Sequence, residues 1–144
     1  MIKVFIENEA GSNQKNIFNE GTLEYHKTVT VSRVYPFPYG FILNTRSGDG
    51  DALDCFVLTR QALKSRSIVE CKPVGMFEQV EDGEEDPKVL VVLEGDPVEV
   101  TDEIEKKLQD FITHVFDHLP GKEIKIGNFY GQAEAVTLLK RMNL

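Results

Sequence analysis

The sequence predicts an α+β fold in which a small β-barrel carries two helices packed on its outside. Most of the short strand-like segments come first in the chain, and two amphipathic helical segments follow them. The chain has 144 residues, of which 41% are hydrophobic and 28% are charged, a composition typical of a folded globular protein. This length is enough to bury one core, so we expect a single domain over residues 1–144.

The expected strands show either alternation of apolar and polar residues or a short apolar run. Residues 2–7 and 28–32 alternate with a period of two, as half-buried strands do. Pro36 and Pro38 exclude a helix over residues 35–40, which must be extended or turned. Further strands are expected over residues 41–43, 53–58, 68–77, 89–93 and 122–126, and loops over residues 11–14 and 81–88.

The first expected helix begins at residue 101 or 102 and ends at Pro120. Either Thr101 or Asp102 can cap it, and Asp102 has Glu105 three residues further on, as in a capping box. A second amphipathic helix is expected over residues 132–142. The apolar stripe of the first helix consists of Ile104, Leu108, Phe111, Ile112, Val115, Phe116 and Leu119.

The charge balance limits the classes of partner. The formal net charge is −8, whereas nucleic acids and anionic membranes require a basic surface. We therefore expect neither nucleic-acid nor membrane binding. The sequence contains no long apolar run and no signal-peptide pattern, which favours a cytoplasmic location. Cys55 and Cys71 lack metal-ligand spacing and are expected to be free, buried thiols.

The segment between Ser47 and Cys55 is the main clue to function, because it places Asp49, Asp51 and Asp54 within six residues. Two unit charges about 4 Å apart repel by ~4 kcal/mol at an effective dielectric constant near 20. The apolar run that follows Asp54 prevents this side chain from escaping into solvent. Carboxylates that are held together beside a core are suited to a hard divalent cation such as Mg²⁺.

Two other interpretations of this acidic segment fit less well. A helix-loop-helix calcium site requires an oxygen ligand at its fifth position and Glu at its twelfth. Counted from Asp49, these positions hold Leu53 and Arg60. A simple turn between strands would explain the glycines and one aspartate, but it would not explain Asp54.

Five ordered blocks of the sequence resemble the soluble family I inorganic pyrophosphatases. The segment 49–55 is similar to the three-aspartate signature of that family, and residues 35–42 are similar to its Tyr-Pro-x-x-Tyr-Gly segment. The other three blocks are residues 6–15, 71–75 and 86–88. Together the blocks span most of residues 1–131, so the resemblance does not rest on one short motif.

This resemblance implies an OB-like closed barrel of five strands with two C-terminal helices outside it. It also implies Mg²⁺ as cofactor, with Mn²⁺ as an alternative, and hydrolysis of pyrophosphate to two orthophosphates. The residues that match metal ligands are Asp49, Asp54, Asp86 and Glu81, and Asp51 matches the group that orients or deprotonates the attacking water. The matches to phosphate contacts are Lys15, Lys27, Tyr39 and Lys88, and those to residues that support them are Glu7 and Tyr35.

The chain departs from the family pattern at several polar positions. Ile17 replaces a glutamate, Lys27 replaces an arginine that would clamp phosphate with two hydrogen bonds, and Glu81 replaces an aspartate. Asp82, next to Glu81, is an alternative ligand. Leu119 and Pro120 replace a Tyr-Lys pair, unless Lys122 or Lys125 takes over its role.

Other functions remain open at this point. His114-Val115-Phe116-Asp117-His118 is close to the inverted zinc-protease motif, although its acidic residue is Asp instead of Glu. An OB-like barrel could also bind oligonucleotides, but the net charge of −8 argues against it. The strongest competitor is a weakened homologue that binds Mg²⁺ and a diphosphate compound, or one that hydrolyses a larger diphosphate ester. We also expect a homo-oligomer, with a hexamer favoured, because the chain is as short as the bacterial members.

Overall fold

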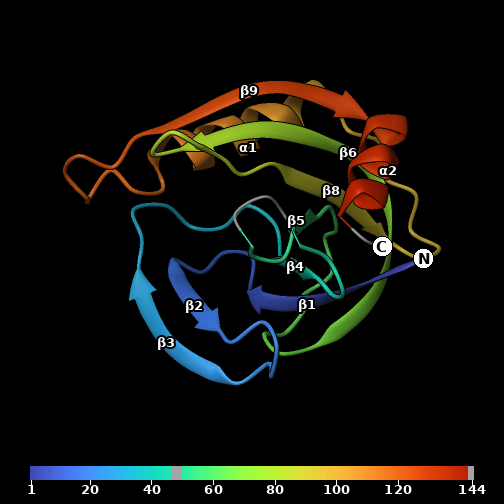
Figure 1. Ribbon diagram of the computed structural model, residues 1–144, viewed down its shortest axis with the longest axis horizontal. Helices are drawn as coiled ribbons and strands as arrows, with labels where there is room; N and C mark the ends of the chain where they lie inside the picture. Colours follow the sequence, from blue (N-terminus) through green and yellow to red (C-terminus); the bar gives the residue numbers. More distant parts are fainter. Residues whose placement is uncertain (47–49, 143–144) are drawn as a thin grey trace.

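The computed structural model describes residues 1–46 and 50–142, and in these residues a barrel of strands is flanked by two helices and a hairpin (Figure 1). The strands are β1 (Ile2–Asn8), β2 (Gln14–Phe18), β3 (Tyr25–Thr30), β4 (Tyr39–Ile42), β5 (Asp54–Val57), β6 (Ile68–Glu81), β7 (Glu84–Glu85), β8 (Lys88–Leu93) and β9 (Ile124–Gly131). The helices are α1 (Asp102–His114) and α2 (Gln132–Arg141). Neither helix is long and apolar enough to cross a membrane.

Five strands close the barrel in the order β1-β4-β5-β8-β6, and β6 returns to pair with β1. The β5–β8 pair is parallel and the other four pairs are antiparallel. β6 is long enough to pair with β1 and β8 in the barrel and with β9 outside it. Its register against β8 shifts between Pro73 and Gly75, and such an irregularity accommodates a proline within a strand. The predicted five-stranded barrel is confirmed.

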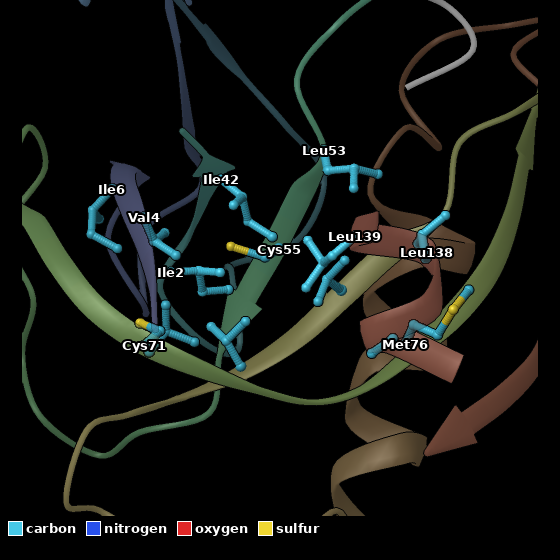
Figure 2. Packing of buried hydrophobic residues seen from close by; sticks show 14 residues of the cluster. Ile2, Val4, Ile6, Ile42, Leu53, Cys55, Cys71, Met76, Leu138 and Leu139 are labelled. Atoms are coloured by element: carbon cyan, nitrogen blue, oxygen red, sulfur yellow. The ribbon is translucent and has the colours of Figure 1, made fainter. Parts of the chain in front are cut away.

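The barrel interior is filled by alternate residues of its strands. The fully buried residues of this interior include Val4 and Ile6 of β1 and Cys55 and Val57 of β5 (Figure 2). The same cluster contains Leu138 and Leu139 of α2. Within the described residues both cysteines are free and buried, as the sequence predicted. α2 therefore completes the apolar interior.

The outer face of the barrel is covered on two sides. Phe56 of β5 and Leu90 of β8 belong to a cluster that includes Phe111 of α1. On the other side Phe18 of β2 packs edge-on against Phe5 of β1, with 5.0 Å between their ring centroids. Because β5 and β8 are apolar on both faces, their polar residues are confined to the strand ends.

The structure corrects several predicted boundaries. The predicted loop 11–14 is one residue too long, because Gln14 already belongs to β2 and pairs with β3. The predicted loop 81–88 contains the two-residue strand β7. β9 extends to Gly131 because it pairs along β6. α1 ends at His114 instead of near Pro120, since the following residues form successive turns. Of the two candidate caps, Thr101 accepts the hydrogen bond from the Ile104 amide at 3.3 Å.

Candidate active site

A cavity of about 440 Å³ lies where the β2–β3 hairpin faces one end of the barrel. β1, β4 and β5 each contribute a residue at that end, and the loop before β5 and the segment before β8 contribute one each. The lining residues are Glu7, Lys15, Asn16, Ile17, Phe18, Asn19, Glu20, Tyr39, Asp51, Asp54 and Asp86. Six predicted site residues, namely Glu7, Lys15, Tyr39, Asp51, Asp54 and Asp86, are thus brought together from distant parts of the chain.

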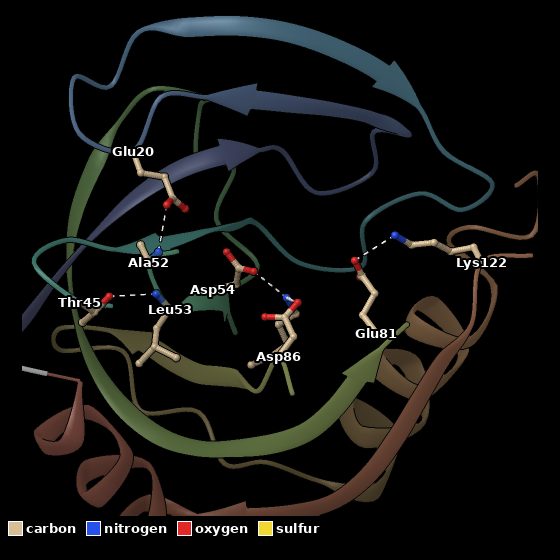
Figure 3. Close-up of polar contacts among 9 residues, drawn as sticks. Glu20, Thr45, Ala52, Leu53, Asp54, Glu81, Asp86 and Lys122 are labelled. Carbon is tan, nitrogen blue, oxygen red and sulfur yellow. Dashed lines mark hydrogen bonds and ion pairs between the residues drawn. The ribbon is translucent and has the colours of Figure 1, made fainter. Parts of the chain in front are cut away.

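The floor of the cavity is an ion-paired triad of Asp54, Asp86 and Lys88. The Lys88 ammonium lies 2.6 Å from Oδ2 of Asp54 and 2.9 Å from Oδ2 of Asp86. The parallel register pairs Cys55 with Val89, so Asp54 and Lys88 begin adjacent strands at the same end of the barrel. The Lys88 side chain is only 4% exposed, and each carboxylate is 22% exposed. Asp54 and Asp86 face each other in Figure 3.

The electrostatics of the triad reflect burial and crowding of like charges. Burial raises the pKa of Asp86 above its usual range, Lys88 opposes this effect, and Asp54 adds to it. Burial alone would lower the pKa of Lys88, but Asp54 and Asp86 outweigh it and the pKa lies above the ordinary value. Burial and then the charge of Asp54 raise the pKa of Glu7 to about 8. Five acidic residues line the cavity against one lysine, so it lacks positive charge.

Aromatic rings lie beside Lys15 and Lys88. The Lys15 ammonium lies 5.8 Å from the ring centroid of Tyr39 and 5.7 Å from that of Phe116, and Lys88 lies 5.7 Å from Tyr39. Tyr39 is 7% exposed and stacks at a tilt on the buried Tyr35, with 5.4 Å between centroids. Burial raises the pKa of both tyrosines above the ordinary value, so they remain neutral phenols near neutral pH.

Five predicted site residues are not among the described residues that line this cavity, and one of them is Tyr35, which packs on Tyr39. Lys27 is exposed on β3, opposite Ile17 in the hairpin register. Glu81 pairs with Lys122 at 3.0 Å, to one side of Asp54 and Asp86 (Figure 3). The alternative ligand Asp82 also pairs with Lys122, at 3.3 Å.

The other two predictions concern Lys88 and Asp49. Lys88 is held in the floor by two carboxylates, in contact with the cavity residues but not among those that line it. Asp49 lies outside the described residues, so the structure says nothing of its place.

The donor set of the floor fits a hard divalent cation. Asp54 and Asp86 already converge on one positive charge, and carboxylate oxygens are the ligands that Mg²⁺ prefers. Over residues 1–46 and 50–142, however, no three His, Cys, Asp or Glu side chains are grouped closely enough to hold a metal on their own. A complete site therefore requires a further donor, for which the sequence offers Asp49.

The predicted zinc-protease alternative finds no support in the geometry. Nδ1 of His114 bonds Oδ2 of Asp117 at 2.8 Å, whereas Nδ1 of His118 bonds Oγ of Ser32 at 2.6 Å. The two histidines are thus engaged with different partners near the end of α1.

Two residues that no sequence motif marks, Glu20 and Thr45, bind the loop that carries Asp51. Oε1 of Glu20 accepts a hydrogen bond from the Ala52 amide, and Oγ1 of Thr45 accepts one from the Leu53 amide, both at 3.0 Å. Glu20 also lines a second cavity of about 630 Å³, in which it is the only acidic lining residue among those described. Size alone therefore does not identify the active site.

Comparison with known proteins agrees with this geometry. The family model described as inorganic pyrophosphatase matches residues 4–143. An inorganic pyrophosphatase from Saccharolobus solfataricus is 34% identical, covering 97% of this chain and 88% of the relative, and one from Nanoarchaeum equitans is 31% identical, covering 97% and 94%. The crystal structure of an inorganic pyrophosphatase from Neisseria gonorrhoeae superimposes with a TM-score of 0.88 at 27% identity, covering 98% and 88% of the two chains. The chain therefore belongs to the inorganic pyrophosphatase family.

Proposed function

We propose that this protein hydrolyses inorganic pyrophosphate to two orthophosphates in the cavity between the hairpin and the barrel. The observation that carries the proposal is the convergence of Asp51, Asp54, Asp86 and Lys15 on one cavity in a member of this family. Pyrophosphate is a small, strongly anionic substrate, and its cleavage depends on positioning and on neutralising charge.

In this proposal Asp51 acts as the general base. It takes a proton from a water molecule, whose oxygen bonds to one phosphorus as the bridging P–O bond breaks and the second phosphate leaves. Lys15 reaches into the cavity and would bind phosphate oxygens, with Tyr39 beneath its ammonium group. Lys88 would hold Asp54 and Asp86 close together and would also contact a phosphate oxygen of the substrate.

We assign the cofactor as Mg²⁺, with Mn²⁺ as an alternative. Its ligands would be Asp54 and Asp86 in the floor, Asp49 from the acidic loop, and Glu81, provided that Glu81 leaves Lys122. When bound, such a metal neutralises phosphate charge and lowers the pKa of coordinated water. The excess of acidic residues in the cavity supports this assignment.

A phosphate-release assay tests the proposal directly. With Mg²⁺ present, pyrophosphate should yield phosphate, and EDTA should abolish the release. Asp51→Asn should lower turnover about a hundredfold or more without loss of fold, since this is the scale of a general base. Glu84→Gln, an exposed change in β7, is the matched control. Turnover near the wild-type value in Asp51→Asn would remove Asp51 from the mechanism.

A second function is favoured by one observation, the apolar Ile17 in the cavity wall. A member that lacks a polar contact there could bind a diphosphate compound and hydrolyse pyrophosphate slowly, or it could accept a larger diphosphate ester. The phosphate-release assay with nucleoside diphosphates, and detection of the nucleoside monophosphate formed from sugar nucleotides, distinguish these cases. Faster hydrolysis of one of these compounds than of pyrophosphate would favour the second function.

A further inference from the structure

Two consecutive amides of the loop before β5 are bonded by side chains from other segments. The Ala52 amide donates to Glu20 and the Leu53 amide donates to Thr45, each at 3.0 Å (Figure 3). Thr45 is 6% exposed and its own hydroxyl donates to the Ile42 carbonyl at 2.6 Å. The Thr45 contact is thus part of the barrel, whereas the Glu20 contact crosses from the hairpin.

The bond to the Ala52 amide acts directly on Asp51. The peptide bond is planar, so the N–H of Ala52 lies in the plane that is attached to the Cα atom of Asp51. An acceptor that binds this N–H limits rotation of the plane about the Cα–C bond of Asp51, and it thereby restricts the backbone conformation that carries the Asp51 side chain. A bond from an amide to an ionised carboxylate is stronger than one between neutral groups.

Glu20 is itself held in place by the turn that follows β2. The side-chain oxygen of Asn19 accepts hydrogen bonds from the amides of Gly21 and Thr22, each at 2.9 Å. The backbone of Asn19 bonds to Leu23 at 2.7 Å and to Glu24 at 2.8 Å. These hydrogen bonds hold the backbone of the turn in one conformation, from which the Glu20 carboxylate reaches the loop.

We propose that Glu20 is a positioning residue, whose carboxylate orients Asp51 by binding the Ala52 amide and so joins the hairpin to the catalytic loop. This inference rests on the proposed role of Asp51 in pyrophosphate hydrolysis. It assigns Glu20 no contact with substrate or metal. The requirement is for an oxygen acceptor at the right distance, not for a negative charge.

Three substitutions of Glu20 test separately whether the length of this side chain or its negative charge is required. Glu20→Ala removes the acceptor and should lower kcat about tenfold, because small misplacements of a catalytic group have effects of this size or more. Glu20→Gln keeps an acceptor oxygen at the same distance and should stay within about threefold of wild type. Glu20→Asp keeps the charge but is one methylene shorter, so it should resemble Glu20→Ala. Glu24→Ala, an exposed change in the same turn, is the control.

A double-mutant cycle tests whether the effect passes through Asp51. In the Asp51→Asn background, Glu20→Ala should cause little further loss of kcat, because the group that it positions is already inactive. Undiminished loss in that background would overturn the inference, as would wild-type activity of Glu20→Ala. Loss in Glu20→Gln with activity retained in Glu20→Asp would show that the charge matters, and this too would overturn it.

Hydrogen exchange of the Ala52 amide provides a measurement that does not depend on turnover. Exchange should be at least about tenfold faster in Glu20→Ala than in wild type, and near the wild-type rate in Glu20→Gln. Equal exchange in all three proteins would refute the positioning contact even if pyrophosphate is hydrolysed. Conversely, wild-type protein that releases no phosphate would refute the proposed function while leaving the contact between Glu20 and Ala52 intact.

Discussion

The cavity has two walls that are built in different ways. The floor residues Asp54 and Lys88 begin strands whose following residues are buried on both faces. The packing of the core therefore fixes where these two charged groups lie. In the hairpin, every residue of β3 is exposed, and β2 is attached to β1 through Phe18 and through Asn16. Changes in the floor should therefore affect folding as well as activity, whereas changes in the hairpin should affect activity alone.

The largest effect is expected in the barrel, where an added methyl group would meet the backbone of a neighbouring strand. An alanine Cβ atom at Gly40 would lie 1.8 Å from the Phe5 carbonyl oxygen, so β1 and β4 would have to separate. We expect Gly40→Ala to lower the free energy of unfolding by about 3 kcal/mol, measured by urea denaturation. At Gly21 in the hairpin the nearest atom is 3.4 Å away, and Gly21→Ala should cost less than about 0.5 kcal/mol. Equal stabilities would refute the distinction between the walls.

The next largest effect concerns the buried cation of the floor. Lys88→Met leaves two carboxylates facing each other and should lower the free energy of unfolding by about 2 kcal/mol in EDTA at neutral pH. This is less than for a fully buried pair, because the carboxylates are 22% exposed. Lys107→Met breaks an exposed pair with Glu103 and should cost at most about 0.5 kcal/mol. A stable Lys88→Met protein would mean that the triad adds little to folding.

A smaller effect, confined to activity, is expected at Lys15 in the hairpin. Loss of a charged contact to phosphate should raise the KM for pyrophosphate about tenfold in Lys15→Ala, with the free energy of unfolding within about 0.5 kcal/mol of wild type. Lys15→Arg should recover part of the affinity because it keeps the charge. Steady-state kinetics and urea denaturation of the same preparations measure both quantities. An unchanged KM would exclude Lys15 as a substrate contact.

The smallest effect is expected at Lys27, which is exposed on β3. Its charge can attract substrate only through solvent, so Lys27→Ala should raise KM by about twofold to threefold at low salt and by less at high salt. Lys140→Ala, an exposed change on α2, should leave KM unchanged at both ionic strengths. A salt-independent effect tenfold or larger would instead indicate that Lys27 contacts the substrate directly.

Much of the barrel was predictable because apolar patterns carry the information. The runs at 53–58 and 89–93 are strands buried on both faces, and the alternation at 2–7 is β1. The β2 strand was missed because its side chains alternate little in polarity and its partner is the exposed β3. The end of α1 was misplaced because Phe116, in the turn after the helix, continues its apolar stripe. From this turn the Phe116 ring contacts Lys15 and Lys122.

The site was predictable where a motif marked it and not where tertiary contacts made it. Asp51 and Asp54 were found in the acidic segment and Asp86 and Lys15 through the family resemblance, and all four share one cavity. Glu20 bonds an amide 32 residues away, and nothing in its local sequence indicates this. The pairing of Glu81 with Lys122 likewise depends on the turn after α1 passing beside β6.

The long strand β6 has a consequence for how the protein folds. Residues 68–71 pair with residues 2–5, and the far part of the strand pairs with β9 near the other end of the chain. Segments so distant in sequence must lose chain entropy to come together before either pairing stabilises the fold, and this makes folding slow. Because one strand serves both pairings, closure of the barrel and docking of the C-terminal segment should occur in a single cooperative kinetic step.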